Sequence, residues 1–299
     1  MKTEQLMGLS IIPVTLLGVV CNWLIVIAIS ANKSLYHSFS LLTGTQAVFN
    51  GVFSVIYLMY VAPMIVFDIQ YLKIHSDHVG FILMICYDST IQTHVIITIN
   101  RFCAVFLPFV YKKVFNLKWT KVIILFSVVI SLTILTIFFQ FLSCSGYYSD
   151  DYFGFTLPDL PICNAYSIYG DVGKLGGMCV FNVIVDSVTI WKVRRVRSAQ
   201  GMKKFQKKEI DFLKQSFGQA VFLMFCISSL YILPMFTTSR VSAFLLGSLL
   251  WPAIHTFDGV LTLYFNMEIR KSLTKRQRNN AISVASSIVI GGKSSIRMN

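Results

Sequence analysis

Seven apolar segments, each long enough to cross a lipid bilayer, constrain the fold of this 299-residue chain more than any other feature. A membrane-spanning helix needs about 20 consecutive, mostly apolar residues. With 55% hydrophobic and 13% charged residues, the chain is also too apolar for a water-soluble globule of this length. The pattern predicts an all-α membrane protein, a seven-transmembrane helix bundle. The predicted spans are residues 7–31, 39–66, 79–106, 119–142, 172–192, 211–236 and 242–267.

Two of these segments are open to another interpretation. The fifth carries Lys174 and Asp186, but without it the acidic loop before it and the basic loop after it would share one side of the membrane. The first could be a cleaved signal peptide, yet its apolar stretch is longer than a typical signal core and lacks a clear cleavage site. We therefore interpret both segments as retained spans.

The distribution of positive charge predicts the orientation of the bundle. An external N-terminus places 22 of the 26 lysines and arginines on the cytoplasmic side, whereas residues 143–171 hold four aspartates and neither lysine nor arginine. The expected organisation is an extracellular N-terminus (1–6), a seven-transmembrane domain (7–267) and a cytoplasmic tail (268–299). The net charge of +13 is explained by this asymmetry and the lipid bilayer, so no nucleic-acid partner is expected.

The third cytoplasmic loop is the most basic part of the chain and includes Lys203 and Lys204. Such a stretch retains the loop in the cytoplasm and attracts anionic lipid headgroups. It could also extend the flanking helices and present them to an acidic protein. Charge alone leaves both interpretations open.

Arg101 follows Asn100 and precedes Phe102 at the end of the third apolar segment. An arginine at mid-bilayer costs about 2.5–3.5 kcal/mol on insertion scales. The predicted topology puts Arg101 near the cytoplasmic end of its helix, where we expect the guanidinium group to reach the interface.

The seven cysteines divide into two groups. Cys144 and Cys163 fall at or within the acidic outer loop, where an oxidising environment would allow a disulfide, although two free thiols remain the alternative. The others lie inside predicted spans and are interpreted as packing residues. They are Cys21, Cys86, Cys103, Cys179 and Cys226.

Two sets of polar residues interrupt the apolar spans. Asn22, Asn50 and Asp258 lie in the first, second and seventh spans, and polar groups at such depth usually face the bundle interior and satisfy one another. The cluster could tie helices together, hold water or an ion, or do both. Asp88 and Gln92 are four residues apart on the third span, so they share a face that could line a ligand cavity or bond a neighbouring helix.

Asp88 and Asp258 could act as the paired carboxylates of an intramembrane protease. The second aspartate motif of presenilin-like proteases requires a glycine two residues earlier, where this chain has Thr256. The five histidines also lack the spacing of a metal site. We therefore expect no enzyme activity, no metal and no cofactor.

From about residue 8 to residue 275, the chain resembles the nematode serpentine chemoreceptors of class X, within the rhodopsin-like seven-helix receptors. The resemblance is carried by VVCNWLIVIAI, YVAPM, TINRFCAVFLPFVYKK, KKEIDFLKQSFGQA and HTFDGVLTLYFNMEIR, in this order. It implies a chemosensory receptor in the plasma membrane, with sensory cilia as a candidate location. The implied partners are a heterotrimeric G protein and an external small molecule or peptide.

The resemblance also assigns roles to individual residues. Asn100, Arg101 and Phe102 stand in place of the Asp-Arg-Tyr element that meets the G protein, and Lys203 and Lys204 belong to the same cytoplasmic face. Asn22 and Asn50 match polar positions of helices one and two. Residues 258–262 replace the Asn-Pro-x-x-Tyr element of helix seven.

The chain departs from the general receptor pattern at several of these positions. Thr262 replaces the tyrosine, Gly259 replaces the proline, and Pro234 lacks a tryptophan two residues before it. Because no cysteine marks the outer end of helix three, a bridge between Cys144 and Cys163 is the expected substitute. Asn50 in place of an aspartate argues against sodium binding. The alternative function is a transporter or a ligand-gated channel subunit, although neither a repeated half nor paired broken helices are evident.

Overall fold

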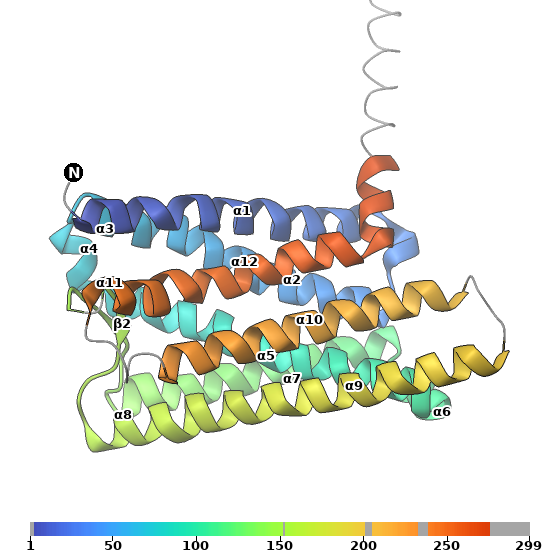
Figure 1. Ribbon diagram of the computed structural model, residues 1–299. Helices are drawn as coiled ribbons and strands as arrows, with labels where there is room; N and C mark the ends of the chain where they lie inside the picture. Colours follow the sequence, from blue (N-terminus) through green and yellow to red (C-terminus); the bar gives the residue numbers. More distant parts are fainter. Residues whose placement is uncertain (1–2, 152, 201–204, 233–238, 276–299) are drawn as a thin grey trace, which may run out of the picture.

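The structure is a computed structural model that describes residues 3–151, 153–200, 205–232 and 239–275. In these residues, seven helical runs lie side by side in one bundle, and α5 passes through its middle (Figure 1). The runs are α1 (Thr3–Ala31); α2 (Ser38–Ile56) with η2 (Tyr57–Val61) and α3 (Ala62–Val66); α5 (Ser76–Phe106); α7 (Leu117–Thr136) with η3 (Ile137–Phe141); α8 (Pro161–Ala165) with η4 (Tyr166–Gly173) and α9 (Lys174–Gln200); α10 (Phe205–Ile232); and α11 (Arg240–Ala243) with η6 (Phe244–Leu249) and α12 (Leu250–Phe265).

The described helices agree with the predicted spans, including the fifth. Six runs are long and apolar enough to cross a membrane, and α10, the sixth in chain order, is the remaining helix of the bundle. The predicted sixth span continues beyond α10 into residues 233–236, which lie outside the described part of the chain. Helix α1 begins at Thr3, so residues 3–6 form the first turn of the first helix.

Short elements connect the spans. Helix α5 ends at Phe106, and Pro108 opens α6 as a separate helix because proline fits the first turn but cannot continue the preceding helix. The described tail is also helical over residues 267–275, with Ile269 buried against α1 and α2. The connecting elements are η1 (Lys33–Leu35), α4 (Gln70–Ile74), α6 (Pro108–Val114), β1 (Tyr147–Ser149) and β2 (Gly154–Thr156).

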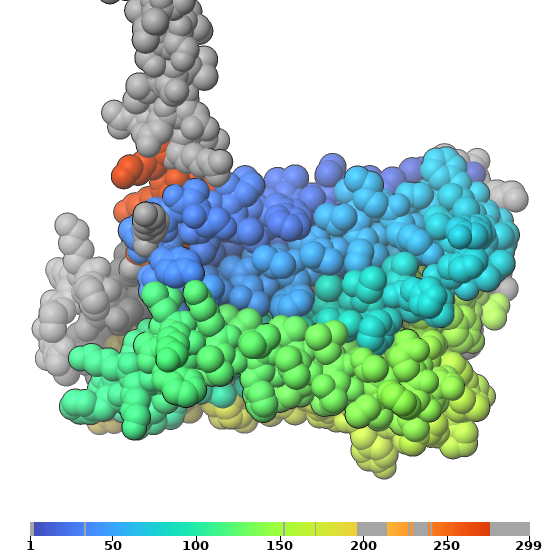
Figure 2. All heavy atoms as spheres, turned by 180° about the vertical axis from the view of Figure 1, so that it is seen from behind, coloured from blue at the N-terminus to red at the C-terminus, as the bar shows by residue number. Residues whose placement is uncertain are grey.

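The helices differ in how much of their surface faces the exterior. In the view from behind, α1, α2 and α7 form much of the visible face (Figure 2). Among the six runs that are apolar enough to cross a membrane, the α7 run buries the smallest share of its most apolar stretch and α5 buries the largest. Polar residues on α5 therefore face other helices, whereas the exposed apolar residues of α7 suit contact with lipid.

The four π-helical stretches of the described chain, η2, η3, η4 and η6, lie toward the end of the bundle that carries β1 and β2 (Figure 1). A π-helical turn widens the backbone locally and is frequent at functional sites. The main apolar core cluster occupies the same end and includes Phe53, Tyr57, Tyr87 and Leu83.

Candidate functional site

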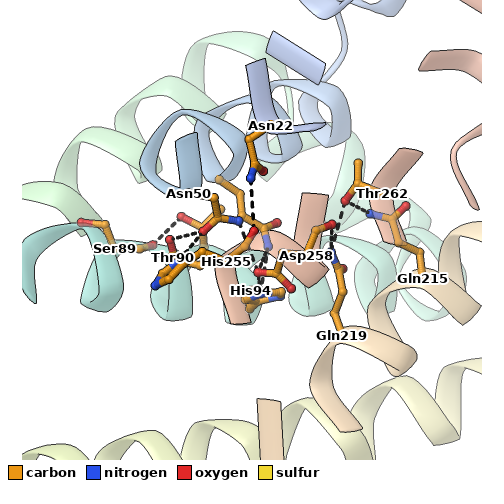
Figure 3. A network of polar contacts seen from close by, with 12 residues as sticks. Asn22, Asn50, Ser89, Thr90, His94, Gln215, Gln219, His255, Asp258 and Thr262 are labelled. Carbon is orange, nitrogen blue, oxygen red and sulfur yellow. Dashed lines mark hydrogen bonds and ion pairs between the residues drawn. The ribbon is translucent and has the colours of Figure 1, made fainter. Parts of the chain in front are cut away.

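Asp258 on α12 is the centre of a buried polar network (Figure 3). Its Oδ2 atom accepts hydrogen bonds from Gln46 Nε2 at 3.0 Å, from Asn50 Nδ2 at 3.3 Å and from His94 Nε2 at 2.8 Å. All four residues are at most 3% exposed. Because a buried carboxylate is costly without partners, these three donors from α2 and α5 make the position of Asp258 possible.

Asn50 extends the network toward α1. Its Oδ1 atom accepts from Thr90 Oγ1 at 3.0 Å and from His255 Nδ1 at 2.7 Å. Asn22 Nδ2 donates to the carbonyl oxygens of His255 at 3.1 Å and Gly18 at 2.9 Å. The predicted cluster of Asn22, Asn50 and Asp258 therefore lies in one network, with Asn22 joined to Asn50 through His255.

Gly259 makes room for Asn22. A Cβ atom at Gly259 would lie 2.9 Å from Asn22 Oδ1 and 3.0 Å from Asn22 Cγ, closer than side chains normally approach. Glycine, which stands here in place of the proline of the general receptor pattern, therefore allows α1 and α12 to approach closely.

Two glutamines of α10 attach that helix to α12. Gln215 Nε2 donates to Thr262 Oγ1 at 2.9 Å, and Gln219 Nε2 reaches both Thr262 Oγ1 at 3.2 Å and the Asp258 carbonyl oxygen at 3.1 Å. Thr262, which replaces the tyrosine of the general receptor pattern, thus receives hydrogen bonds from the sixth helix of the bundle.

Asp88 and Gln92 form a second polar site, between α5, α7 and α9. Gln92 Nε2 donates to Asp88 Oδ2 at 2.8 Å and to Ser131 Oγ at 2.9 Å, and Ser127 Oγ donates to Gln92 Oε1 at 2.7 Å. The ammonium group of Lys174 forms an ion pair with Asp88. In this structure, these residues hold helices together.

Lys174 and Asp186, inside the fifth span, both face opposite charges on α5. Lys174 pairs with Asp88, while Asp186 attracts Arg101 and accepts from Thr98 Oγ1 at 3.5 Å. Charges in the bilayer usually pair with one another inside a bundle. The ion pair between Lys174 and Asp88 therefore ties the first turn of α9 to α5.

Arg101 does not reach the interface, so the expectation of an interfacial guanidinium is wrong. The residue is 7% exposed, and its guanidinium carbon lies 4.8 Å from the centre of the Phe39 ring. None of its three side-chain nitrogens has a hydrogen-bond acceptor among the described residues. The physical reason is that α5 continues to Phe106, more than a turn beyond Arg101, and α2 and α9 cover this face.

The neighbours of Arg101 have different surroundings. Asn100 Nδ2 donates to Ser38 Oγ at 3.4 Å, while the Phe102 ring stacks on Phe106 with centres 4.6 Å apart. Lys203 and Lys204 lie outside the described residues.

Cys144 and Cys163 are joined by a disulfide bond, with Cα atoms 5.5 Å apart and both side chains fully buried. The bond connects the end of the α7 run to α8 and closes the loop that contains β1 and β2. The remaining cysteines of the chain are free and buried.

Comparison with known proteins identifies the family. The profile of the serpentine type 7TM GPCR chemoreceptors, Srx, matches residues 12–266. This chain belongs to the Srx family. Serpentine receptor class X 45 of Caenorhabditis elegans is 27% identical in an alignment that covers 90% of this chain and 81% of that relative. The Srx protein is therefore a multi-pass membrane protein from a family of chemoreceptors, and that family is one of receptors, not of enzymes.

Sequence reasoning missed several members of the network in this Srx chain. A signal existed, because Gln46 and Asn50 are four residues apart, as are Gln215 and Gln219. Polar residues at this spacing share one face of a helix. Thr90 and His94 have the same spacing, but only packing decides that His94 meets Asp258 and that His255 meets Asn50.

Proposed function

We propose that this Srx protein is a plasma-membrane receptor that binds an external small molecule or peptide and activates a heterotrimeric G protein. The observation that carries the proposal is the buried network around Asp258, which links α2, α5, α10 and α12 through side chains that can exchange partners. A ligand that binds one arrangement of these helices more tightly than another shifts the population toward it. Membership of a chemoreceptor family supports the sensory role.

The proposed orientation has residues 1–6 outside, the seven-transmembrane domain over residues 7–267, and the tail of residues 268–299 in the cytoplasm. The positive-inside rule supports it, because 22 of 26 lysines and arginines then lie on the cytoplasmic side. Sensory cilia remain the candidate location.

The G-protein contact is proposed at Asn100, Arg101 and Phe102, with Lys203 and Lys204 of the third cytoplasmic loop adding positive charge on the same side of the membrane. The guanidinium donors of Arg101 are enclosed and unused by protein groups among the described residues. If α9 and α10 move away from α5, these donors become available to acceptors of a partner. Binding energy from the partner would then favour the open arrangement.

Asp88 and Gln92 are the proposed polar contacts for the ligand. Their present partners, Lys174 and Ser131, belong to two other helices. A ligand that replaced either partner would loosen α5 from α7 or α9, so binding would change the packing of the central helix.

The proposal is tested by expressing the receptor with a promiscuous G protein and screening a panel of odorants and metabolites for a second-messenger response. We expect at least one ligand-dependent response, and its loss in Arg101→Ala when receptors at the surface are matched in number. Ligand-dependent ion currents or uptake without any G protein would instead indicate a channel or a transporter.

A further inference from the structure

The described tail forms a short helix that turns away from the bundle. Helix α12 ends where Asn266 adopts an extended conformation, with φ −83° and ψ 91°. Asn266 Oδ1 then accepts a hydrogen bond from the backbone N–H of Ile269 at 3.2 Å, which is the usual role of an asparagine at the start of a helix. The tail helix over residues 267–275 therefore begins in a new direction, beside the end of α1 (Figure 1).

One face of the tail helix packs on α1. Ile269 is fully buried in a core cluster with Ala28, and Leu273 packs against the same cluster. The Ser272 hydroxyl group donates to the Ala28 carbonyl oxygen at 3.2 Å. These contacts determine which face of the tail helix points away from the protein.

The opposite face of the tail helix is basic and lines a cavity of about 390 Å³. Its residues recur every three or four positions, so they share one side of the helix. Arg270 Nη1 donates to the backbone carbonyl oxygens of Leu263 and Tyr264 at the end of α12, which fixes the guanidinium group at the cavity. The residues that line this basic cavity are Met267, Arg270, Lys271, Thr274 and Lys275.

The positive charge of the basic cavity is concentrated. The ion pairs among the described residues include none of its three cations, and Glu268, beside the cavity, has its Oε2 atom 3.7 Å from His37 Nε2. In the sequence, residues 270–278 contain five lysines and arginines and neither aspartate nor glutamate. Like charges gathered in one place repel one another, so the cavity favours an anion with several negative charges.

The cavity lies where a membrane surface is expected. Tyr264, in the last turn of α12, is 67% exposed, and Met267 is 37% exposed. Tyrosine is enriched where membrane helices pass from hydrocarbon to water. In the proposed orientation this surface belongs to the cytoplasmic leaflet, whose anionic lipids attract basic segments next to membrane helices. A phospholipid can therefore place its headgroup in the cavity while its acyl chains stay in the bilayer.

We propose that the basic cavity binds the headgroup of a phosphoinositide, an anionic phospholipid that carries several phosphate groups. The planar guanidinium group of Arg270 fits phosphate oxygens, and Lys271 and Lys275 add point charges for further phosphates. A headgroup with a single net charge neutralises only part of the cavity. The inference goes beyond the proposed receptor function, because lipid binding at the tail helix requires neither an external ligand nor a G protein.

The experiment titrates the purified full chain, in a neutral detergent, with dioctanoyl phosphatidylinositol bisphosphate. Lys271→Gln with Lys275→Gln removes two exposed charges and leaves Arg270 in place. Because each basic residue at an anionic surface contributes about fivefold in affinity, the dissociation constant should rise about tenfold or more. Lys112→Gln with Lys113→Gln, at two exposed lysines of α6, is the matched control and should bind like the wild type.

The thermal unfolding midpoint without lipid checks that the variants fold. If the cavity variant unfolds at a lower temperature than the wild type, Lys271→Gln alone takes its place, with an expected loss of about fivefold. An equal loss of affinity in the cavity variant and in the α6 variant would overturn the proposal, because general attraction to positive charge gives that pattern. Unchanged affinity in the cavity variant would overturn it as well.

Two further titrations identify the anion. Phosphatidylserine of the same chain length carries fewer negative charges, so its dissociation constant should be about tenfold higher or more. Soluble inositol trisphosphate lacks acyl chains and should bind more weakly than the lipid. Equal binding of phosphatidylserine, or of the soluble headgroup, would overturn the assignment to a phosphoinositide. None of these measurements involves signalling, so failure here leaves the proposed receptor function standing, and failure of coupling leaves the lipid result standing.

Discussion

Arg101 and Asp186 are opposite charges buried on adjacent helices, and each retains unused hydrogen-bonding capacity. The three side-chain nitrogens of Arg101 and the Oδ1 atom of Asp186 have no hydrogen-bond partner among the described residues. Each charge stabilises the other through their mutual attraction. Removing one therefore leaves the other as an isolated buried charge, which is more costly than removing both.

The first prediction concerns this pair. Asp186→Asn should lower the free energy of unfolding by about 3 kcal/mol, while the double variant Arg101→Gln with Asp186→Asn should lose less. Thermal unfolding of the purified receptor, together with surface abundance, measures both effects. The exposed Ser187→Ala serves as the control on the same helix. Additive losses in the double variant would show that the two charges do not interact.

The second prediction concerns Gly259. Alanine at this position would press its Cβ atom against Asn22, so we expect a destabilisation of about 1–3 kcal/mol and weaker signalling for each receptor delivered. Gly176→Ala is the matched control, because a Cβ atom there meets no other atom within 4 Å. The measurement is the unfolding midpoint in detergent. An equal shift for both variants would contradict the role assigned to Gly259.

At the scale of structural elements, the outer loop and helix α10 are attached to the bundle in different ways. The disulfide between Cys144 and Cys163 fixes the loop covalently at both ends of the hairpin. Helix α10 is attached to α12 by neutral hydrogen bonds from Gln215 and Gln219. Hydrogen bonds of this kind contribute about 1 kcal/mol each, so α10 is easier to move than the loop.

The third prediction concerns the disulfide. The chain-entropy account gives a loop of this size a stabilisation of about 3 kcal/mol. Cys144→Ser and Cys163→Ser should reduce surface abundance equally, and the double variant should be no worse than either, because the two residues act as a unit. Cys103→Ser, which removes a free cysteine, is the control. Mass spectrometry of the unreduced loop peptide checks the bond itself, and alkylation of both thiols in the surface protein would contradict it.

At the scale of the whole molecule, the two ends of the bundle carry different groups of residues. One end carries β1, β2 and the aromatic core, and the other carries Arg101 and the helical tail of residues 267–275. The polar network around Asp258 joins five helices between these ends (Figure 3). The hydrogen bonds of this network reach as far as Gln215 on α10 and Thr262 on α12.

The fourth prediction is the orientation of the whole molecule. An N-terminal epitope tag should be accessible on intact cells, and a tag after residue 275 should require permeabilisation, because of the charge asymmetry between the two sides. Both tags are stained on the same cells, so that each is the control for the other. Staining of the C-terminal tag on intact cells would show the opposite orientation. The hairpin would then lie on the cytoplasmic side.

The sequence by itself determined the spans, the fold class and three members of the buried polar network. Apolar segments such as residues 119–142 identify a helix that crosses the membrane, because the free energy of transfer into lipid depends on local composition. Asn22, Asn50 and Asp258 were found for a similar reason: polar groups in such segments must turn inward. Family motifs are runs of consecutive residues, so they too can be recognised from the sequence alone.

Only the tertiary structure decided which buried groups meet. His94 contacts Asp258 across 164 positions of the chain, and Ser248 meets Phe153 across 95. Such pairs depend on how each helix is rotated about its axis and shifted along the bundle. The free energy of transferring one segment into lipid does not depend on either. The expectation that Arg101 reaches the interface fails for this reason. The sequence shows that Arg101 is near a helix end, but its burial depends on α2 and α9 packing over it.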